Sequence, residues 1–354
     1  MTSAWIRPSV RRTRAYESRR LPDARDLLLD LNEGAPLAPN EWLAEIAAKT
    51  GMDAARRYPD ASPLEERLAR HLQVDQGNVI VTNGGDDAID RICRACLEPG
   101  DELIFPTPSF EIISRAAANI GAKVTTVPWM GDSFPLEAVV SKATGRTKLV
   151  SVVSPNNPTG SVIMRSELET LAGRLPDTLI MVDLAYTEFA TEDLTGAALD
   201  IPNAVIIRTF SKAYGLAGLR IGYAAGPADT IEAMRTVGMP FSCSTLSMNA
   251  ALAALDMSGS VLAERTRRVR EERAKITVLL RNRGSEVLDS QANFVLARFE
   301  NAGEVWKQLA DRGIRVRRFT NPLLNDWLRI GCPGETTGLS RLIPALEDIL
   351  NVRE

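Results

Sequence analysis

The sequence predicts an α/β fold in which helices cover a large, mostly parallel sheet, followed by a smaller α+β unit. Most of its seven candidate strands are nearly continuous apolar runs, as expected for strands buried on both faces. Helical patterns at 86–97, 110–119 and 165–174 separate several of them, and this alternation favours parallel strands. The candidate strands are 79–82, 102–105, 123–127, 148–153, 179–183, 204–209 and 221–225.

The pattern changes in the last third of the chain. One long helical stretch is expected from 246 to about 281, and its charged end is typical of a helix that leaves one domain for another. We therefore predict a large domain at 42–250 and a small domain built from 1–41, including an N-terminal arm, and 251–354. The small domain is expected to hold strands 286–288, 293–298, 315–317 and 327–330 and helices 303–311 and 337–350.

Composition narrows the possible functions. A hydrophobic fraction of 45% and a charged fraction of 25% are ordinary for a soluble protein, and a net charge of -3 offers no general attraction to nucleic acid. The chain has no apolar run long enough for a membrane span, and with His71 as its only histidine we expect no metal site. Cys93 and Cys96 fall inside a helical pattern, so they are interpreted as packed side chains of a cytoplasmic protein.

The strongest indication of chemistry begins where the sixth candidate strand ends. From position 209 the chain runs Thr-Phe-Ser-Lys-Ala-Tyr-Gly-Leu-Ala-Gly-Leu-Arg. Lysine is rarely buried without a function, and partial desolvation would make Lys212 a nucleophile toward aldehydes. Thr209, Ser211 and Arg220 are the donors that a phosphate ester needs. The glycines also fit a plain turn or a dinucleotide loop, although their spacing is not G-x-G-x-x-G.

Three other strings follow candidate strands, at the edge where open α/β sheets bind ligands. Ser-Pro-Asn-Asn-Pro-Thr-Gly at 154–160 offers side-chain amides to a ligand oxygen, or forms only a turn. Asp183 ends an apolar strand and needs a partner such as a protonated ring nitrogen, unless it only caps a helix. Thr-Asn-Gly-Gly-Asp-Asp at 82–87 opens a helix whose free N–H groups suit an anion, although the two aspartates also make good caps.

Together these strings resemble the pyridoxal-phosphate (PLP) enzymes of fold type I, class I/II aminotransferases, and most closely the histidinol-phosphate aminotransferases. The resemblance extends from Leu31 to Arg329 and depends most on the Ser-Lys-x-x-Gly-Leu-x-Gly-x-Arg and Asn-Asn-Pro-Thr-Gly strings. It implies PLP as cofactor, bound by the large domain, and a homodimer. It also implies exchange of an amino group between a donor, expected to be glutamate, and a keto or aldehyde acceptor.

The same resemblance implies a role for each site residue. Lys212 would carry the cofactor as a Schiff base and then move a proton. Asp183 would pair with the ring nitrogen, while Asn157 and Tyr186 would hydrogen-bond the ring's phenolic oxygen. The other residues would stack on the ring (Phe110), bind its phosphate (Gly85, Asp86, Thr209, Ser211, Arg220) or reach that phosphate from the neighbouring subunit (Tyr58).

The expected substrate is histidinol phosphate, which must share one site with glutamate. Arg329 resembles the residue that holds a substrate carboxylate, and Tyr16 in the arm would add a hydroxyl. On a strand, Arg315 and Arg317 would share a face and point at one anion, unless they form a solvated basic edge. The alternatives are an aromatic or other amino-acid substrate, bound by Arg329 alone, and decarboxylation of a phospho-amino acid on the same scaffold.

The chain departs from the family pattern at a few positions. Leu184 replaces a glutamate, Ile113 a tyrosine and Ser242 an asparagine, and Gly34 and Ala35 alter the Leu-Asn-Glu-Asn-Pro opening. These positions are expected near the substrate or the dimer interface, so they bear on the choice of substrate and leave the cofactor chemistry unchanged.

Overall fold

The computed structural model describes residues 5–12, 26–131, 133–257 and 259–351. Within these ranges one seven-stranded sheet has every neighbouring pair parallel, except the pairs made by its second strand, β8 (Gly222–Ala225), which is antiparallel to both neighbours. The predicted mostly parallel sheet is confirmed. In order across the sheet the strands are β2 (Val79–Thr82), β8, β7 (Ala204–Thr209), β6 (Leu179–Asp183), β5 (Thr147–Val153), β3 (Glu102–Thr107) and β4 (Lys123–Pro128).

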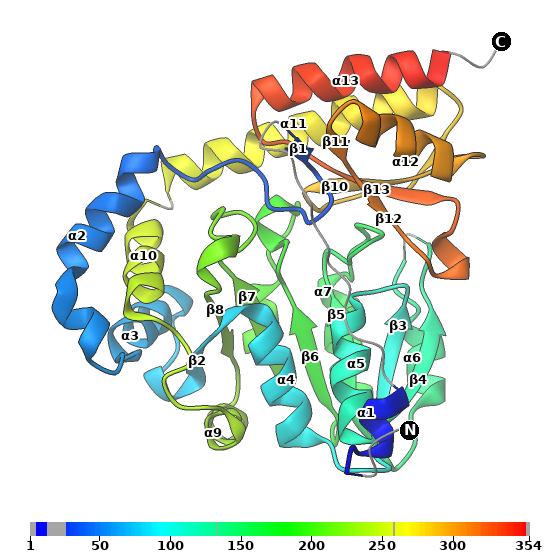
Figure 1. Cartoon of the computed structure of the whole chain (residues 1–354). Helices are drawn as coiled ribbons and strands as arrows, with labels where there is room; N and C mark the ends of the chain where they lie inside the picture. The colour runs from blue at the N-terminus through cyan, green and yellow to red at the C-terminus, as the bar shows by residue number, and fades with distance from the viewer. Residues whose placement is uncertain (1–4, 13–25, 132, 258, 352–354) are drawn as a thin grey trace.

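Helices cover both faces of this sheet (Figure 1). Because successive side chains of a strand point to opposite faces, Ile206 of β7 packs in one core and Ile207 in the other. One core includes α4 (Gly84–Cys96), α5 (Glu111–Ile120) and α9 (Ala228–Val237). The other includes α3 (Ser62–Leu72), α6 (Leu136–Lys142), α7 (Arg165–Arg174), α8 (Thr195–Leu199) and α10 (Thr245–Asp256), and α2 (Asn40–Arg56) packs on α10.

A smaller antiparallel sheet follows, in the order β12 (Arg317–Arg318), β13 (Trp327–Gly331), β10 (Phe294–Arg298) and β9 (Glu286–Val287). Beside it, β1 (Leu27–Leu28) pairs in parallel with β11 (Ile314–Arg315). The helices α11 (Ser260–Asn282), α12 (Ala302–Asp311) and α13 (Thr336–Asn351) lie on the side away from the large sheet (Figure 1). The small sheet therefore lies between these helices and the large sheet (Figure 1).

Two predicted elements are wrong. The single helix expected at 246–281 is two helices, α10 and α11, set at 84° to each other, because Gly259 takes φ -58° and ψ -88°, outside the helical range. The single strand expected at 315–317 is divided between β11 and β12, which belong to different sheets.

Among the described residues no single helix is long and apolar enough to cross a membrane. In the part of the chain that the structure describes, one bent pair, α10 with α11, reaches the required length and composition. At the other end of the chain, the short helix α1 (Pro8–Arg12) packs on α5, where the Ser9 hydroxyl donates to the carbonyl of Asn119 at 3.1 Å.

Candidate active site

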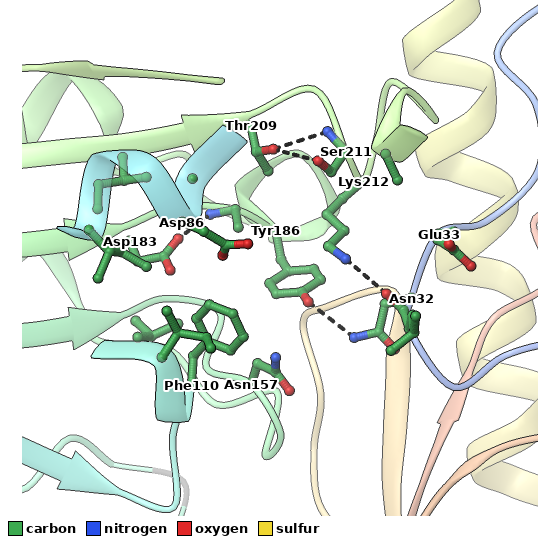
Figure 2. Close-up of a pocket in the computed structure, with 18 of the residues that line it drawn as sticks. Asn32, Glu33, Asp86, Phe110, Asn157, Asp183, Tyr186, Thr209, Ser211 and Lys212 are labelled. Atoms are coloured by element: carbon green, nitrogen blue, oxygen red, sulfur yellow. Dashed lines mark hydrogen bonds between the residues drawn. The ribbon is translucent and has the colours of Figure 1, made fainter. Parts of the chain in front are cut away.

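One cavity of about 540 Å³ opens at the carboxyl edge of the large sheet. Val153, Asp183 and Thr209, the last residues of β5, β6 and β7, all line it. Loops that follow parallel strands meet at this edge, so residues far apart in sequence come together. Figure 2 shows most of the lining. The predicted site residues that line this cavity are Gly85, Asp86, Phe110, Asn157, Asp183, Tyr186, Thr209, Ser211, Lys212, Arg220 and Arg329.

Lys212 reaches into this cavity from the loop between β7 and β8 (Figure 2). Its Nζ donates to the carbonyl oxygen of Leu31 at 2.8 Å and lies 5.7 Å from the centre of the Tyr186 ring. A carbonyl and an aromatic face hold an amine less tightly than an ion pair would. The lysine is therefore positioned for nucleophilic attack and can leave its present partners at low cost.

Asp183 places a buried carboxylate at the opposite side of the cavity from Lys212 (Figure 2). Burial raises the pKa of this carboxyl to about 6, although the N–H of Ala185, 3.0 Å from Oδ1, and the positive charge of Lys212 oppose the rise. A buried carboxylate is costly unless a donor or cation faces it. A protonated ring nitrogen in the cavity would meet that need.

Hydroxyl and guanidinium groups gather beside the start of α4. The Thr209 hydroxyl donates to Ser211 Oγ at 2.9 Å and accepts from the Ser211 N–H at 3.1 Å. Arg220, held in the left-handed region at φ 49°, extends its guanidinium to Ser211 Oγ at 3.5 Å and to Asp86 at 3.2 Å. With the free N–H groups of a 13-residue helix, these donors form a cradle suited to a phosphate.

Glycine is required where this cradle closes. Gly84 opens α4 at φ 77°, and a Cβ there would lie 2.6 Å from the Arg220 guanidinium. A Cβ on Gly222 would lie 2.9 Å from the Gly84 carbonyl carbon. The backbones of β8 and α4 therefore touch directly, which brings the loop that carries Lys212 against the start of the helix.

The two asparagines of the 154–160 string have different positions and hydrogen-bond partners. Asn156 is fully buried and holds its own loop, since its Nδ2 donates to the Pro108 carbonyl and to Thr159 Oγ1, both at 2.9 Å. Asn157 lines the cavity, and its Oδ1 accepts from Arg329. The sequence prediction chose Asn157, and it is this asparagine that faces the cavity.

The segment 31–33, just after β1, supplies cavity residues that the sequence analysis did not assign. Leu31 accepts from Lys212, and Asn32 Nδ2 donates to the hydroxyl of Tyr186 at 3.1 Å. Glu33 also lines the cavity. The Leu-Asn-Glu string was available as a signal, since the family resemblance begins there, but no strand or turn pattern marked it as part of a site.

Three predicted site residues lie elsewhere. Tyr58 is 82% exposed and stacks on Phe241 with ring centres 4.6 Å apart, outside the cavity. Arg317 lines a second, adjoining cavity. Tyr16 lies outside the described residues.

The expected pairing of Arg315 with Arg317 is wrong. Arg315 belongs to β11 and bonds Asp26 at 2.7 Å, whereas Arg317 belongs to β12 and lies 6.0 Å from the Phe319 ring centre. The buried Val316 separates the two strands, so the two guanidinium groups serve different sites.

Two departures from the family pattern, Leu184 and Ile113, are buried in the hydrophobic cores and line neither cavity, although their neighbours Ala185 and Ile112 line the first one. Ile112, the neighbour of Ile113, is the residue that lines the cavity. Because a helix directs adjacent residues about 100° apart, the pattern alone did not show which isoleucine faces inward.

Cys93, Cys96 and His71 do not line the cavity. Burial raises the pKa of the Cys93 thiol to about 12 and that of Cys96 to about 11, and both lie within α4 as expected. His71 lies in α3, where burial and the nearby Arg208 lower its pKa. Among the described residues no group of three or more His, Cys, Asp or Glu side chains could hold a metal ion.

Comparison with known proteins gives this site its context. Residues 27–346 match the family Aminotransferase class I and II. The chain is 36% identical over 342 residues to the aromatic amino acid aminotransferase of Mycobacteroides abscessus, covering 94% of this chain and 96% of that one. It is also 36% identical over 362 residues to the histidinol-phosphate aminotransferase of Symbiobacterium thermophilum, covering 98% of each.

A solved structure has a similar fold. The histidinol-phosphate aminotransferase of Sinorhizobium meliloti, in complex with pyridoxal-5'-phosphate, superposes with a TM-score of 0.87 at 27% identity, covering 99% of this chain and 98% of that one. The chain belongs to the class I and II aminotransferases and has the fold-type I architecture of PLP-dependent transferases. It is a PLP-dependent aminotransferase.

The described residues fit that cofactor. The buried Asp183 needs a cationic ring nitrogen, Lys212 offers an amine, and the cradle beside α4 presents neutral and cationic donors to a phosphate. These groups surround one cavity, so a single ligand with all three features satisfies them together.

Proposed function

We propose that this aminotransferase exchanges an amino group between glutamate and histidinol phosphate. The observation that carries the proposal is the position of two arginines on neighbouring strands. Arg317 and Arg329 are directly opposite in the antiparallel pairing of β12 with β13, so their side chains leave the same face of the sheet. A phosphate or carboxylate bound at this face can accept hydrogen bonds from both guanidinium groups.

The two cavities suit a substrate with an anion at one end. The second cavity, of about 920 Å³, adjoins the first and shares Phe110, Asn157 and Arg329 with it. Arg317 lies in the second cavity only. A substrate amine beside Lys212 would therefore leave its distal phosphate near the two arginines, whose guanidinium groups have a geometry suited to both phosphate and carboxylate.

When bound, PLP supplies an aldehyde carbon for amines and a ring that accepts electrons from the substrate. In the proposed mechanism Lys212 Nζ would hold the cofactor through that carbon and would move a proton to and from the substrate carbon. The Asp183 carboxylate would face the protonated ring nitrogen, and Tyr186 and Asn157 would donate to the phenolic oxygen. The phosphate would be held by Thr209, Ser211, Arg220 and the N–H groups that open α4, with Gly85 and Asp86 beside it.

A second candidate substrate is an aromatic amino acid. Besides Phe110, the apolar residues that line the first cavity are Leu31, Ile89, Ile112, Val153, Ala185, Ile207 and Ala217. An aromatic side chain would bury its ring against these groups while Arg329 alone binds its carboxylate. In that case Arg317 would contribute nothing to binding.

Substrate comparison separates the two candidates. Turnover of histidinol phosphate, histidinol and phenylalanine should be measured in the wild type and in Arg317→Ala. We expect kcat/KM for histidinol phosphate to fall about tenfold to a hundredfold in the variant, the loss of one charged hydrogen bond, with phenylalanine unaffected. Arg312→Ala, which removes an exposed charge beside α12, is the control. Equal turnover of histidinol phosphate and phenylalanine by the wild type would eliminate the phosphate-binding proposal.

Decarboxylation of a phospho-amino acid on this scaffold is tested by a half-reaction. Adding glutamate alone to the loaded enzyme should bleach the visible absorbance, because the amino group passes to the cofactor. A decarboxylase would keep its absorbance and release carbon dioxide from its own substrate.

We further propose that the active form is a homodimer in which Tyr58 reaches the partner's phosphate site. Tyr58 and Phe241 form an exposed aromatic pair, which is the kind of surface that interfaces bury. The neighbouring Met239 is also exposed.

A further inference from the structure

Three consecutive residues of the small unit contact three reactive side chains of the active site. The carbonyl oxygen of Asp30 accepts a hydrogen bond from Arg329, and that of Leu31 accepts one from Lys212. The side chain of the third residue, Asn32, donates to Tyr186. Figure 2 shows the last two contacts converging on one end of the cavity. The segment 30–32 can therefore orient the side chains of Arg329, Lys212 and Tyr186, which are proposed to act on cofactor and substrate.

Asn32 is held rigidly in that position. Its backbone adopts φ 57°, a left-handed conformation that asparagine tolerates better than most residues. Its carbonyl accepts from Asn293 Nδ2 at 3.1 Å, and the preceding Leu29 bonds to Arg315 and Gly331 on both sides. The side chain is 2% exposed, so its amide cannot turn to water.

The orientation of the amide decides the direction of its bond to Tyr186. As placed, Nδ2 faces the tyrosine hydroxyl, and the buried Oδ1 has no hydrogen-bond partner among the described residues. Reversing the amide would move the NH₂ group into that unpartnered position. Buried N–H groups without acceptors are rarer in proteins than buried carbonyls without donors, so the donor orientation costs less.

A phenol has one proton to donate and lone pairs that accept. Because Asn32 already donates to the Tyr186 oxygen, the phenolic proton is left for an acceptor in the cavity. We propose that Asn32 is a positioning residue that sets the direction of the Tyr186 hydrogen bond, so that the phenol donates into the cavity to the phenolic oxygen of bound PLP. This inference requires that PLP occupies the cavity on Lys212, whatever the amino acceptor is.

The proposal predicts a spectroscopic effect. A donor to the ring's phenolic oxygen reduces the negative charge with which that oxygen holds the proton on the Lys212 nitrogen. Asn32 strengthens this donor, since a hydroxyl that accepts a hydrogen bond donates a stronger one. Losing the effect should raise the pH midpoint at which the visible absorbance of the loaded protein changes.

Two substitutions of Asn32 should raise the pH midpoint of the visible absorbance by different amounts. Asn32→Ala removes the donor and should raise the midpoint by about half a pH unit. Asn32→Asp has nearly the same shape but can only accept, so Tyr186 must donate to it, and the midpoint should rise by about one pH unit or more. The Asp variant also serves where the Ala variant folds poorly.

A double-mutant comparison tests whether Asn32 acts through the hydrogen bond of Tyr186 or only supports the local structure. In a Tyr186→Phe background Asn32→Ala should give no further shift, and Asn32→Asp should keep only the part due to its added charge. Asn203→Ala is the control, because it removes partly buried amide hydrogen bonds to the carbonyls of Leu175 and Thr178 and Asn203 does not line the cavity. It should lower stability and leave the midpoint unchanged.

The outcomes are distinct. The role of Asn32 is overturned if Asn32→Ala shifts the pH midpoint equally in the wild type and in Tyr186→Phe. It is also overturned if Asn32→Ala causes no shift in the protein that retains Tyr186. A wild-type protein that gains no visible absorbance with PLP overturns the cofactor assignment itself.

Discussion

Replacing Asp183 by asparagine should stabilise the cofactor-free protein at neutral pH. Burial raises the pKa of this carboxyl from its usual 3.8 to about 6, so the folded state binds a proton that the unfolded state releases between these values. Stability from this group is therefore fully present below about pH 4 and is lost as pH rises through about pH 6. Above that window the cost of the buried charge is about 3 kcal/mol.

Asparagine removes that cost while keeping the local structure. Its Oδ1 can still accept from the Ala185 N–H, so the strand end keeps its hydrogen bond. Urea unfolding of cofactor-free wild type and Asp183→Asn at about pH 5 and about pH 7.5 measures the effect. The variant should be the more stable at the higher pH, by up to about 3 kcal/mol, with a smaller difference at the lower pH.

A control variant and added PLP distinguish the effect of the buried Asp183 charge from a general effect of surface charge. Asp177→Asn, at an exposed turn before the same strand, should show no such pH dependence. Added PLP should stabilise the wild type more than Asp183→Asn, because only the carboxylate pairs with a charged ring nitrogen. The reasoning is refuted if Asp183→Asn is no more stable than wild type at about pH 7.5, or gains equally at both pH values.

Three further predictions concern individual side chains. Lys212→Ala should fold but fail to acquire visible absorbance with PLP, and borohydride trapping on the wild type should label Lys212; a label on another lysine would contradict the assignment. Mixed Lys212→Ala and Tyr58→Ala subunits should give more activity than either parent, since a hybrid dimer regains one intact site; an active monomer would disprove sharing. Native Cys93 and Cys96 should resist alkylation at about pH 8 until the protein unfolds, because burial keeps both thiols protonated, and rapid native labelling would show otherwise.

The cofactor pocket was largely predictable because its residues sit at strand ends. A buried strand is a continuous apolar run in sequence, and a polar residue that ends the run, such as Asp183 or Thr209, must lie at the sheet edge. The candidate cofactor residues around Lys212 line one cavity for this reason, with Tyr58 the exception. Their individual roles stay predictions.

The substrate end was harder to predict because it depends on short, irregular segments. The two-residue strands β11 and β12 carry no periodicity that separates them, so the break at Val316 and the Arg315–Asp26 bond left no pattern to detect. Arg317 gains its position opposite Arg329 from pairing with a strand ten residues later, a tertiary property. Similarly, Asn32 follows a strand whose partner lies near the other end of the chain.

The one antiparallel strand of the large sheet also constrains how the protein folds. The β7–β8 hairpin that carries Lys212 closes a short loop, whereas β8 meets β2 only across the length of chain that holds β3 to β7. Closing such a long loop is slow, because its entropy is lost before the contacts that repay it have formed. The contact of Gly84 with Gly222 should therefore be a late event. Cofactor added during refolding would bind only after it, so the appearance of colour would time the completion of the large sheet.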